Sequence, residues 1–225
     1  MKRASKFFTD FEKSRIDQAV TAAESATSAE IVPAVATVSG RYDRAEDIVG
    51  VWLACILLAG VWAVLKAQGA EDTHWGTTWG RFELPLLIGA VALGFVIGAA
   101  LATYVAVIRR IFTPAREMRD EVRAAAAKVF HDRRVHHTTG ATGLLIYLSL
   151  YERMAALVAD QTVLDSVGQT ALDELCDKLV AGVRRGDAGT ALCEAITDAG
   201  ERLKVVLPRA AADRNEISNA LVILD

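Results

Sequence analysis

Residues 84–108 read LPLLIGAVALGFVIGAALATYVAVI and residues 48–65 read IVGVWLACILLAGVWAVL, and neither stretch contains a charged side chain. An α-helix rises about 1.5 Å per residue, so each stretch is long enough to cross the roughly 30 Å hydrocarbon core of a bilayer. The loop between them, residues 66–83, is too short to form a domain. The sequence therefore predicts a transmembrane helical hairpin, and the lipid bilayer is its first expected partner.

Lysine and arginine residues around the hairpin predict its orientation. The loop has only Lys66 and Arg81, whereas eight basic residues flank the outer ends of the two spans: Arg41, Arg44, Arg109, Arg110, Arg116, Arg119, Arg123 and Lys128. Because basic flanks remain cytoplasmic, both termini are expected in the cytoplasm of a prokaryotic cell, with a multi-pass protein in its inner membrane. The arginines between residues 109 and 123 are expected to meet anionic lipid headgroups.

Small residues recur every four positions in the second span. They are Ala90, Gly94, Gly98 and Ala102. Such a ridge lets another helix approach closely, because no large side chain intervenes. Two partners fit the pattern: the first span of the same chain, or the ridge of a second protomer, which would give a homo-oligomer.

The remaining residues, 1–47 and 109–225, are expected to form one discontinuous soluble domain into which the hairpin, residues 48–108, is inserted. The net charge is −3 and the isoelectric point is about 5.9, so no nucleic-acid partner is expected. The three cysteines form no Cys-x-x-Cys pair, which is typical of packing residues in a reducing compartment.

Apolar patterns predict the first strands and helices of this domain. Thr9 and Glu12 have the spacing of a capping box that begins a helix. Glu30–Val38 favours a strand, but Pro33 cannot donate to a ladder, so an outer strand or an irregular segment is expected. Leu144–Leu150 is almost continuously apolar, which predicts a central strand covered on both faces.

The rest of the chain completes the predicted fold. A tight polar link, Tyr151–Arg153, is expected to join the central strand to a second one that ends at Asp160. Helical periodicity follows at residues 172–183 and 192–203, and residues 221–224 fit either an edge strand or a docked tail. The predicted fold class is α/β: an αβα sandwich with a small central sheet, interrupted by the inserted transmembrane hairpin.

The order of several motifs resembles the TPM domain family, named after thylakoid, photosystem-repair and nematode receptor-associated founders. The motifs are TSAEIV at residues 27–32, TGLLIYLSLYER at 142–153, Ala159-Asp160, RGD at 185–187, Ala195-Ile196, Leu207-Pro208 and NEI at 215–217. The resemblance covers residues 7–45 and 113–220, and NEI is similar to a motif of the bacterial membrane-bound branch. It implies a compact αβα sandwich. It also implies activities that differ among members: acid phosphatase, assembly or repair of membrane complexes, and receptor regulation.

Recognisable phosphatase motifs are missing from the sequence. Neither Cys176 nor Cys193 is followed by the arginine of a Cys-x5-Arg loop, and no Asp-x-Asp pair or phosphate-binding glycine loop occurs. Asp160 is the best catalytic, ligand or metal candidate, because ligands of α/β sheets gather beyond the carboxyl ends of strands. The alternative for Asp160 is a turn cap. Asp187 is a second ligand candidate, and its plainer role is to cap the last helix.

Imidazole and carboxylate groups near residue 130 suggest a metal site. His136 and Asp132, with Asp160, would be its ligands, and a divalent cation would be the cofactor. The spacing is poor for this purpose, and adjacent histidines in a loop are more often solvated.

The expected function is non-enzymatic: a membrane-tethered module that binds other membrane proteins in complex assembly or quality control. The alternative is an acid phosphatase or metal-assisted hydrolase of phosphate esters that uses Asp160. A channel or transporter is disfavoured, since neither span has an ionisable residue to line a path.

Overall fold

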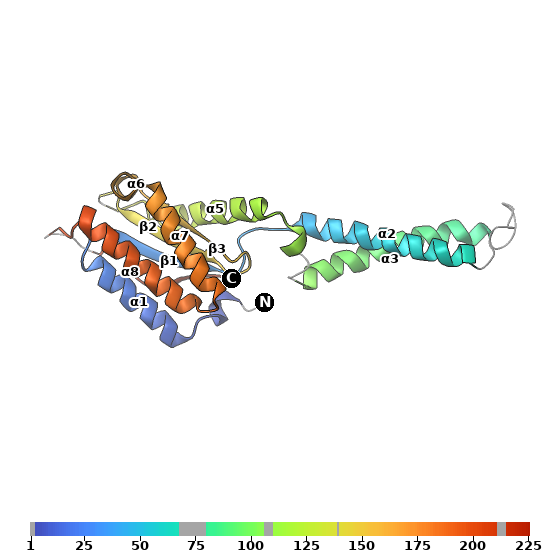
Figure 1. Ribbon diagram of the computed structural model, residues 1–225, viewed down its shortest axis with the longest axis horizontal. Helices are drawn as coiled ribbons and strands as arrows, with labels where there is room; N and C mark the ends of the chain where they lie inside the picture. Colours follow the sequence, from blue (N-terminus) through green and yellow to red (C-terminus); the bar gives the residue numbers. More distant parts are fainter. Residues whose placement is uncertain (1–2, 68–79, 106–109, 139, 211–214) are drawn as a thin grey trace. The chain divides into compact units, whose positions relative to one another are not determined.

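The computed structural model describes residues 3–67, 80–105, 110–138, 140–210 and 215–225. The chain divides into two compact units, one formed by residues 1–40 with 116–225 and the other by residues 41–115. The first unit is a mixed α/β fold with a small sheet, and the second is a pair of apolar helices (Figure 1). The predicted fold class is therefore confirmed.

The sheet has four strands in the order β3-β2-β1-β4. They are β1 (Glu30–Ala36), β2 (Gly143–Ser149), β3 (Met154–Ala159) and β4 (Val222–Leu224). β1 is parallel to β2 and to β4, while β2 and β3 form an antiparallel hairpin. The predicted central strand is β2, and the last residues do form a short edge strand.

The prediction of an outer position for the strand around Pro33 is wrong, because β1 lies between β2 and β4. β4 pairs only with Ala34–Ala36. The N–H of Thr37 donates to the Leu224 carbonyl, and strand residues two or four apart point the same way, so Pro33 faces the β4 side. β4 begins opposite Ala34, so a backbone N–H at position 33 would have no strand to pair with. The lack of an N–H at Pro33 therefore costs the sheet no hydrogen bond.

Helices cover both faces of the sheet, which makes the αβα sandwich (Figure 1). One face packs against α1 (Asp10–Glu24), α7 (Gln169–Arg184) and α8 (Ala188–Val206), and the other against α5 (Ala115–Asp132). Every residue of β1 and β2 is buried. Alternate side chains of β1 and β2 therefore enter two separate apolar cores. The short helices are η1 (Ala4–Lys6) and α6 (Gln161–Val167).

Two apolar helices form the second unit: α2 (Asp43–Ala67) and α3 (Gly80–Tyr104). Within them, Ala45–Ala67 and Glu83–Tyr104 are long and apolar enough to cross a membrane. The C-terminal end of the second predicted span, residues 106–108, lies outside the described residues.

The small-residue ridge of α3 contacts α2. A Cβ atom added to Gly94 would lie 2.7 Å from the Ala54 Cα, and one added to Gly98 would lie 2.8 Å from the Gly50 Cα. Ala102 is fully buried, and Ala90 is partly buried. The ridge thus packs against the first span, as one of its two expected partners, and a homo-oligomer built on it stays a prediction.

Candidate functional site

β3 has one open side. The N–H of Asp160 donates to the Gly143 carbonyl over 2.9 Å, which fixes the alternation of the antiparallel ladder. The backbone groups of Ala155, Leu157 and Ala159 consequently point away from β2. Among the residues that the structure describes, no strand pairs with this side. The backbone N–H and C=O groups of β3 are therefore directed at the surface of the domain.

A groove of about 830 Å³ runs along this open side of β3. We call it the β3 groove: its floor is residues 154–158, one wall is α5, and the other wall is α7. Apolar side chains lie low on the walls, including Val122 of α5 and Leu172 and Val180 of α7. The groove thus combines a strand edge with an apolar lining.

Opposite charges line the two walls of the β3 groove. Arg119 and Arg123 are exposed on α5, one helical turn apart, and Asp173 and Asp177 are exposed on α7 with the same spacing. Arg184 adds a positive charge near the end of the α7 wall. Each wall therefore presents a pair of like charges to anything that enters the groove.

Cys176 lies between the two aspartates of the α7 wall. Its Sγ donates a hydrogen bond to the Ala155 carbonyl over 3.1 Å. Burial raises the pKa of the Cys176 thiol to about 11, and the negative charges of Asp177 and Asp173 add to this effect, while Arg123 opposes it. The thiol is therefore protonated at neutral pH and acts as a hydrogen-bond donor to the open edge.

Asp160, the predicted catalytic and ligand candidate, extends the β2–β3 ladder. It follows β3 directly and occupies the N-cap position of α6, but its side chain makes no capping bond. Its carboxylate instead accepts a hydrogen bond from the Gly143 N–H over 3.3 Å. Backbone and side chain of Asp160 together close the end of the strand pair.

Asp187, the second ligand candidate, caps α8. Its carboxylate accepts a hydrogen bond from the Thr190 N–H over 3.0 Å, and this bond lowers the pKa of the fully exposed Asp187 side chain. The geometry is that of an ordinary N-cap, the plainer of the two roles considered for this residue.

The three predicted metal ligands do not form a site. Among the described residues, no three His, Cys, Asp or Glu side chains are arranged to hold a metal ion. Asp132 is exposed at the end of α5, and the Asp160 carboxylate is bound to the Gly143 N–H. His136 instead stacks edge-on against His131 and His137, with ring centroids 4.9 Å and 4.4 Å away.

The β3 groove was not predicted from the sequence. Two signals for it are present: the strand MAALVA contains neither proline nor charge, and two charge pairs recur at helical spacing. Neither signal says which helices flank the strand, since α5 precedes the sheet hairpin and α7 follows it.

Comparison with known proteins supports the fold of this chain but not a function. No family model matches the chain, and no curated protein matches it. A solved structure that is similar is the NMR structure of the BA42 protein from the psychrophilic bacterium Bizionia argentinensis, with a TM-score of 0.57. The sequence identity is 16%, and the alignment covers 99% of each chain. At this identity the likeness concerns the α/β architecture alone.

Proposed function

We propose that this chain is a membrane-tethered, TPM-like interaction module that binds other membrane proteins through the β3 groove, in the assembly or quality control of membrane complexes. Its αβα unit would lie on the cytoplasmic side of a prokaryotic inner membrane, held there by α2 and α3. The observation that carries the proposal is the β3 groove, where an open strand edge lies between two oppositely charged walls.

The surface of the helical pair supports the tether. Trp52, Trp62, Leu86 and Ile88 are each more than half exposed. Only 17% and 11% of the most apolar windows of α2 and α3 are buried, unlike the core helix of a soluble protein. So much exposed apolar surface is stable in lipid, where both helices satisfy their own backbone hydrogen bonds.

The sheet supports a return to the starting side of the membrane. β1 precedes the helical pair, β2 follows it, and the two strands pair along seven residues of one ladder. They must therefore share a compartment, which two spans allow and one would not. The excess of basic residues in the flanks favours the cytoplasm as that compartment.

The test is site-specific photo-crosslinking of the full chain in native membranes. A photoreactive amino acid replaces exposed Gln169, which lines the β3 groove, and a control chain carries it at Asp17, exposed on α1. We expect crosslinks to a discrete membrane protein from position 169 and not from position 17.

Two results would contradict this function. The first is equal crosslinking from the two positions. The second is enzyme-like turnover of phosphomonoesters by the purified full chain that Asp160→Ala abolishes, which would establish the phosphatase alternative. A titration with divalent cations and inorganic phosphate, followed by thermal unfolding, checks the same alternative independently.

A further inference from the structure

We infer that the occupant of the β3 groove is an extended peptide segment of another protein, which adds a strand to β3 and in which acidic and basic side chains alternate. This inference rests on the proposed function and specifies how the partner is recognised.

The two sides of the sheet differ in how their exposed backbone groups are protected from pairing with another strand. On the β4 side, the half of β1 that β4 leaves uncovered is closed by Pro33, and the Glu24 carboxylate accepts a hydrogen bond from the Ile31 N–H over 2.9 Å. Prolines and charges of this kind protect natural edges from pairing with other chains. β4 itself contains neither kind of residue but is only three residues long, whereas β3 is twice as long and also contains neither.

The β3 edge presents the backbone N–H and C=O groups that strand addition requires. Leu157 and Ala159 direct N–H and C=O groups outward, and the neighbouring Ala155 carbonyl is held by the Cys176 thiol. A peptide strand placed about 4.8 Å from β3 would satisfy these groups through main-chain hydrogen bonds. Such pairing gives affinity that does not depend on the peptide's side chains.

The walls of the groove favour a single chain over a second copy of this protein. The edge is the floor of a groove flanked by α5 and α7, so it is recessed between them. A second αβα unit would bring covering helices of its own, which would meet these walls before the two edges could pair. One extended peptide brings no such layers.

The charges of the walls specify the side chains of the peptide. Successive residues of a strand point to opposite faces, so alternate residues would face α5 and α7. Residues four apart on a helix are separated by about 6 Å along its axis, close to the roughly 6.6 Å between alternate strand residues. Two acidic residues would therefore match Arg119 and Arg123, and the intervening basic residues would match Asp173 and Asp177.

The experiment titrates fluorescent peptides into the purified full chain in detergent micelles and measures anisotropy. One peptide alternates glutamate and lysine over six residues, the length of β3. A second has the same composition in blocks, and further versions of the first carry backbone N-methyl groups at odd or at even positions. We expect the alternating peptide to bind about tenfold more tightly than the block peptide. Only one of the two N-methyl sets should abolish binding, since strand residues alternate in the direction of their N–H groups.

Variants of the wall charges complete the test. Arg119→Glu combined with Arg123→Glu should weaken binding of the alternating peptide about tenfold or more. Lys128→Glu is the matched control, because Lys128 is exposed on the same helix but does not line the groove. All the positions changed are exposed, so each variant is expected to fold.

Several outcomes would overturn the inference. The first is equal affinity for the alternating and block peptides, and the second is binding that neither N-methyl set weakens. The third is a double arginine variant that still binds the peptide but no longer binds anionic-lipid vesicles. The fourth is self-association of the wild-type chain that the double arginine variant loses. Crosslinking from position 169 without peptide binding would leave the proposed function standing and refute strand addition. Peptide binding without a membrane partner would do the reverse.

Discussion

At the scale of single residues, the two carboxylates predicted to bind a ligand accept hydrogen bonds from backbone N–H groups. Asp160 bonds to Gly143, and Asp187 bonds to Thr190. Both carboxylates stabilise junctions between elements, where backbone donors would otherwise lack a partner. An aspartate that follows a strand or precedes a helix is therefore an ambiguous signal of function. Hydrogen bonding to the backbone and catalysis both favour carboxylates at these positions.

Asp160→Ala should lower the free energy of unfolding by about 1 kcal/mol, because it removes one hydrogen bond to a charged acceptor at the end of the β2–β3 pair. Thermal unfolding of the full chain in micelles, followed by far-UV circular dichroism, measures the change. Asp132→Ala is the control: Asp132 is exposed, and its loss should cost less than about 0.5 kcal/mol. A larger effect at Asp132 would show that the structural account of these two residues is wrong.

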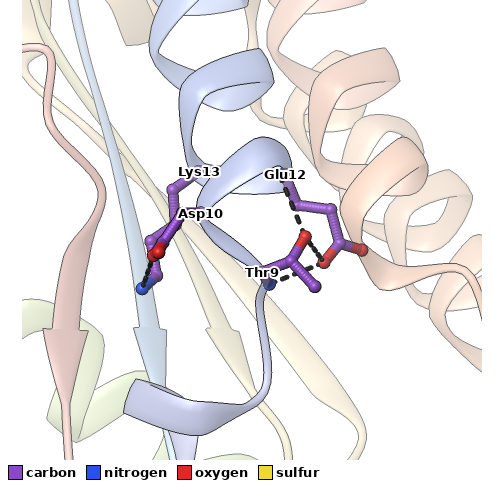
Figure 2. Close-up of polar contacts among 4 residues, drawn as sticks. All are labelled: Thr9, Asp10, Glu12 and Lys13. Atoms are coloured by element: carbon purple, nitrogen blue, oxygen red, sulfur yellow. Dashed lines mark hydrogen bonds and ion pairs between the residues drawn. The ribbon is translucent and has the colours of Figure 1, made fainter.

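The start of α1 provides a pH-dependent contribution to stability (Figure 2). The Glu12 carboxylate accepts hydrogen bonds from the N–H and the hydroxyl of Thr9, each over 2.7 Å, and these bonds lower the pKa of Glu12. The Thr9 hydroxyl in turn accepts a bond from the Glu12 N–H over 3.2 Å. This arrangement is a complete capping box, as the sequence predicts.

Glu12→Gln should therefore destabilise the domain at neutral pH and matter less in acid. A carboxyl group whose pKa is lower in the folded state stabilises that state above its ordinary pKa. The stabilisation is lost as the pH falls through that value, near 4, toward the lowered one. Unfolding of wild type and variant between pH 7 and pH 3 checks this: the difference between them should shrink below about pH 5. A difference that grows in acid would contradict the assigned bonds.

Cys176 should be slow to alkylate in the folded protein. With a pKa raised to about 11, its thiolate fraction at pH 8 is roughly a hundredfold below that of an ordinary cysteine. Iodoacetamide labelling resolved by mass spectrometry should show this ratio between the native chain and the denatured chain. The rate should rise about tenfold per pH unit until the pKa is approached. A native rate equal to the denatured rate would mean that Cys176 is neither buried nor hydrogen-bonded.

At the scale of elements, the approach of α2 to α3 depends on glycines that face the partner helix. Gly94→Leu should separate the helices, because even a Cβ at this position lies 2.7 Å from the Ala54 Cα. Gly89→Leu in the same helix is the control, since a Cβ there meets no atom within 4 Å. Titration with SDS in mixed micelles, read by tryptophan fluorescence, should show an earlier transition for Gly94→Leu but not for Gly89→Leu. Equal transitions would refute the packing.

Most elements were predictable from the sequence because each carries its own local signal. The capping box begins α1, the continuous apolar run of residues 144–150 is β2, and the apolar stretches form the helical pair. The position of β1 was not predictable, because Pro33 is tolerated only thanks to the length of β4, almost 190 residues away along the chain. The β3 groove was hidden for a related reason: its walls come from segments on either side of the strand, and only packing brings them together.

At the scale of the whole molecule, the paired strands on either side of the helical pair make a prediction about topology. Reporter fusions at Gly76, which lies outside the described residues, and after Asp225 should report opposite sides of the membrane. Paired alkaline phosphatase and fluorescent protein fusions at each position provide the measurement. A cytoplasmic signal from the fusion at position 76 would rule out the two-span arrangement.

The pairing of β1 with β2 also sets an order of events during synthesis. About 100 residues separate Ala36 from Gly143, and a ribosome that adds about 5–20 residues per second needs roughly 5–20 s to make them. During this delay β1 has left the ribosome without its partner strand, and under the proposed topology the two apolar helices would enter the membrane in the same interval. If only one of the two spans crossed, β2 would emerge on the side of the membrane opposite β1, and the two strands could not pair. Under the proposed topology, a completed sheet thus distinguishes a chain in which both spans have crossed from a half-inserted chain, in which β1 would remain without its partner strand.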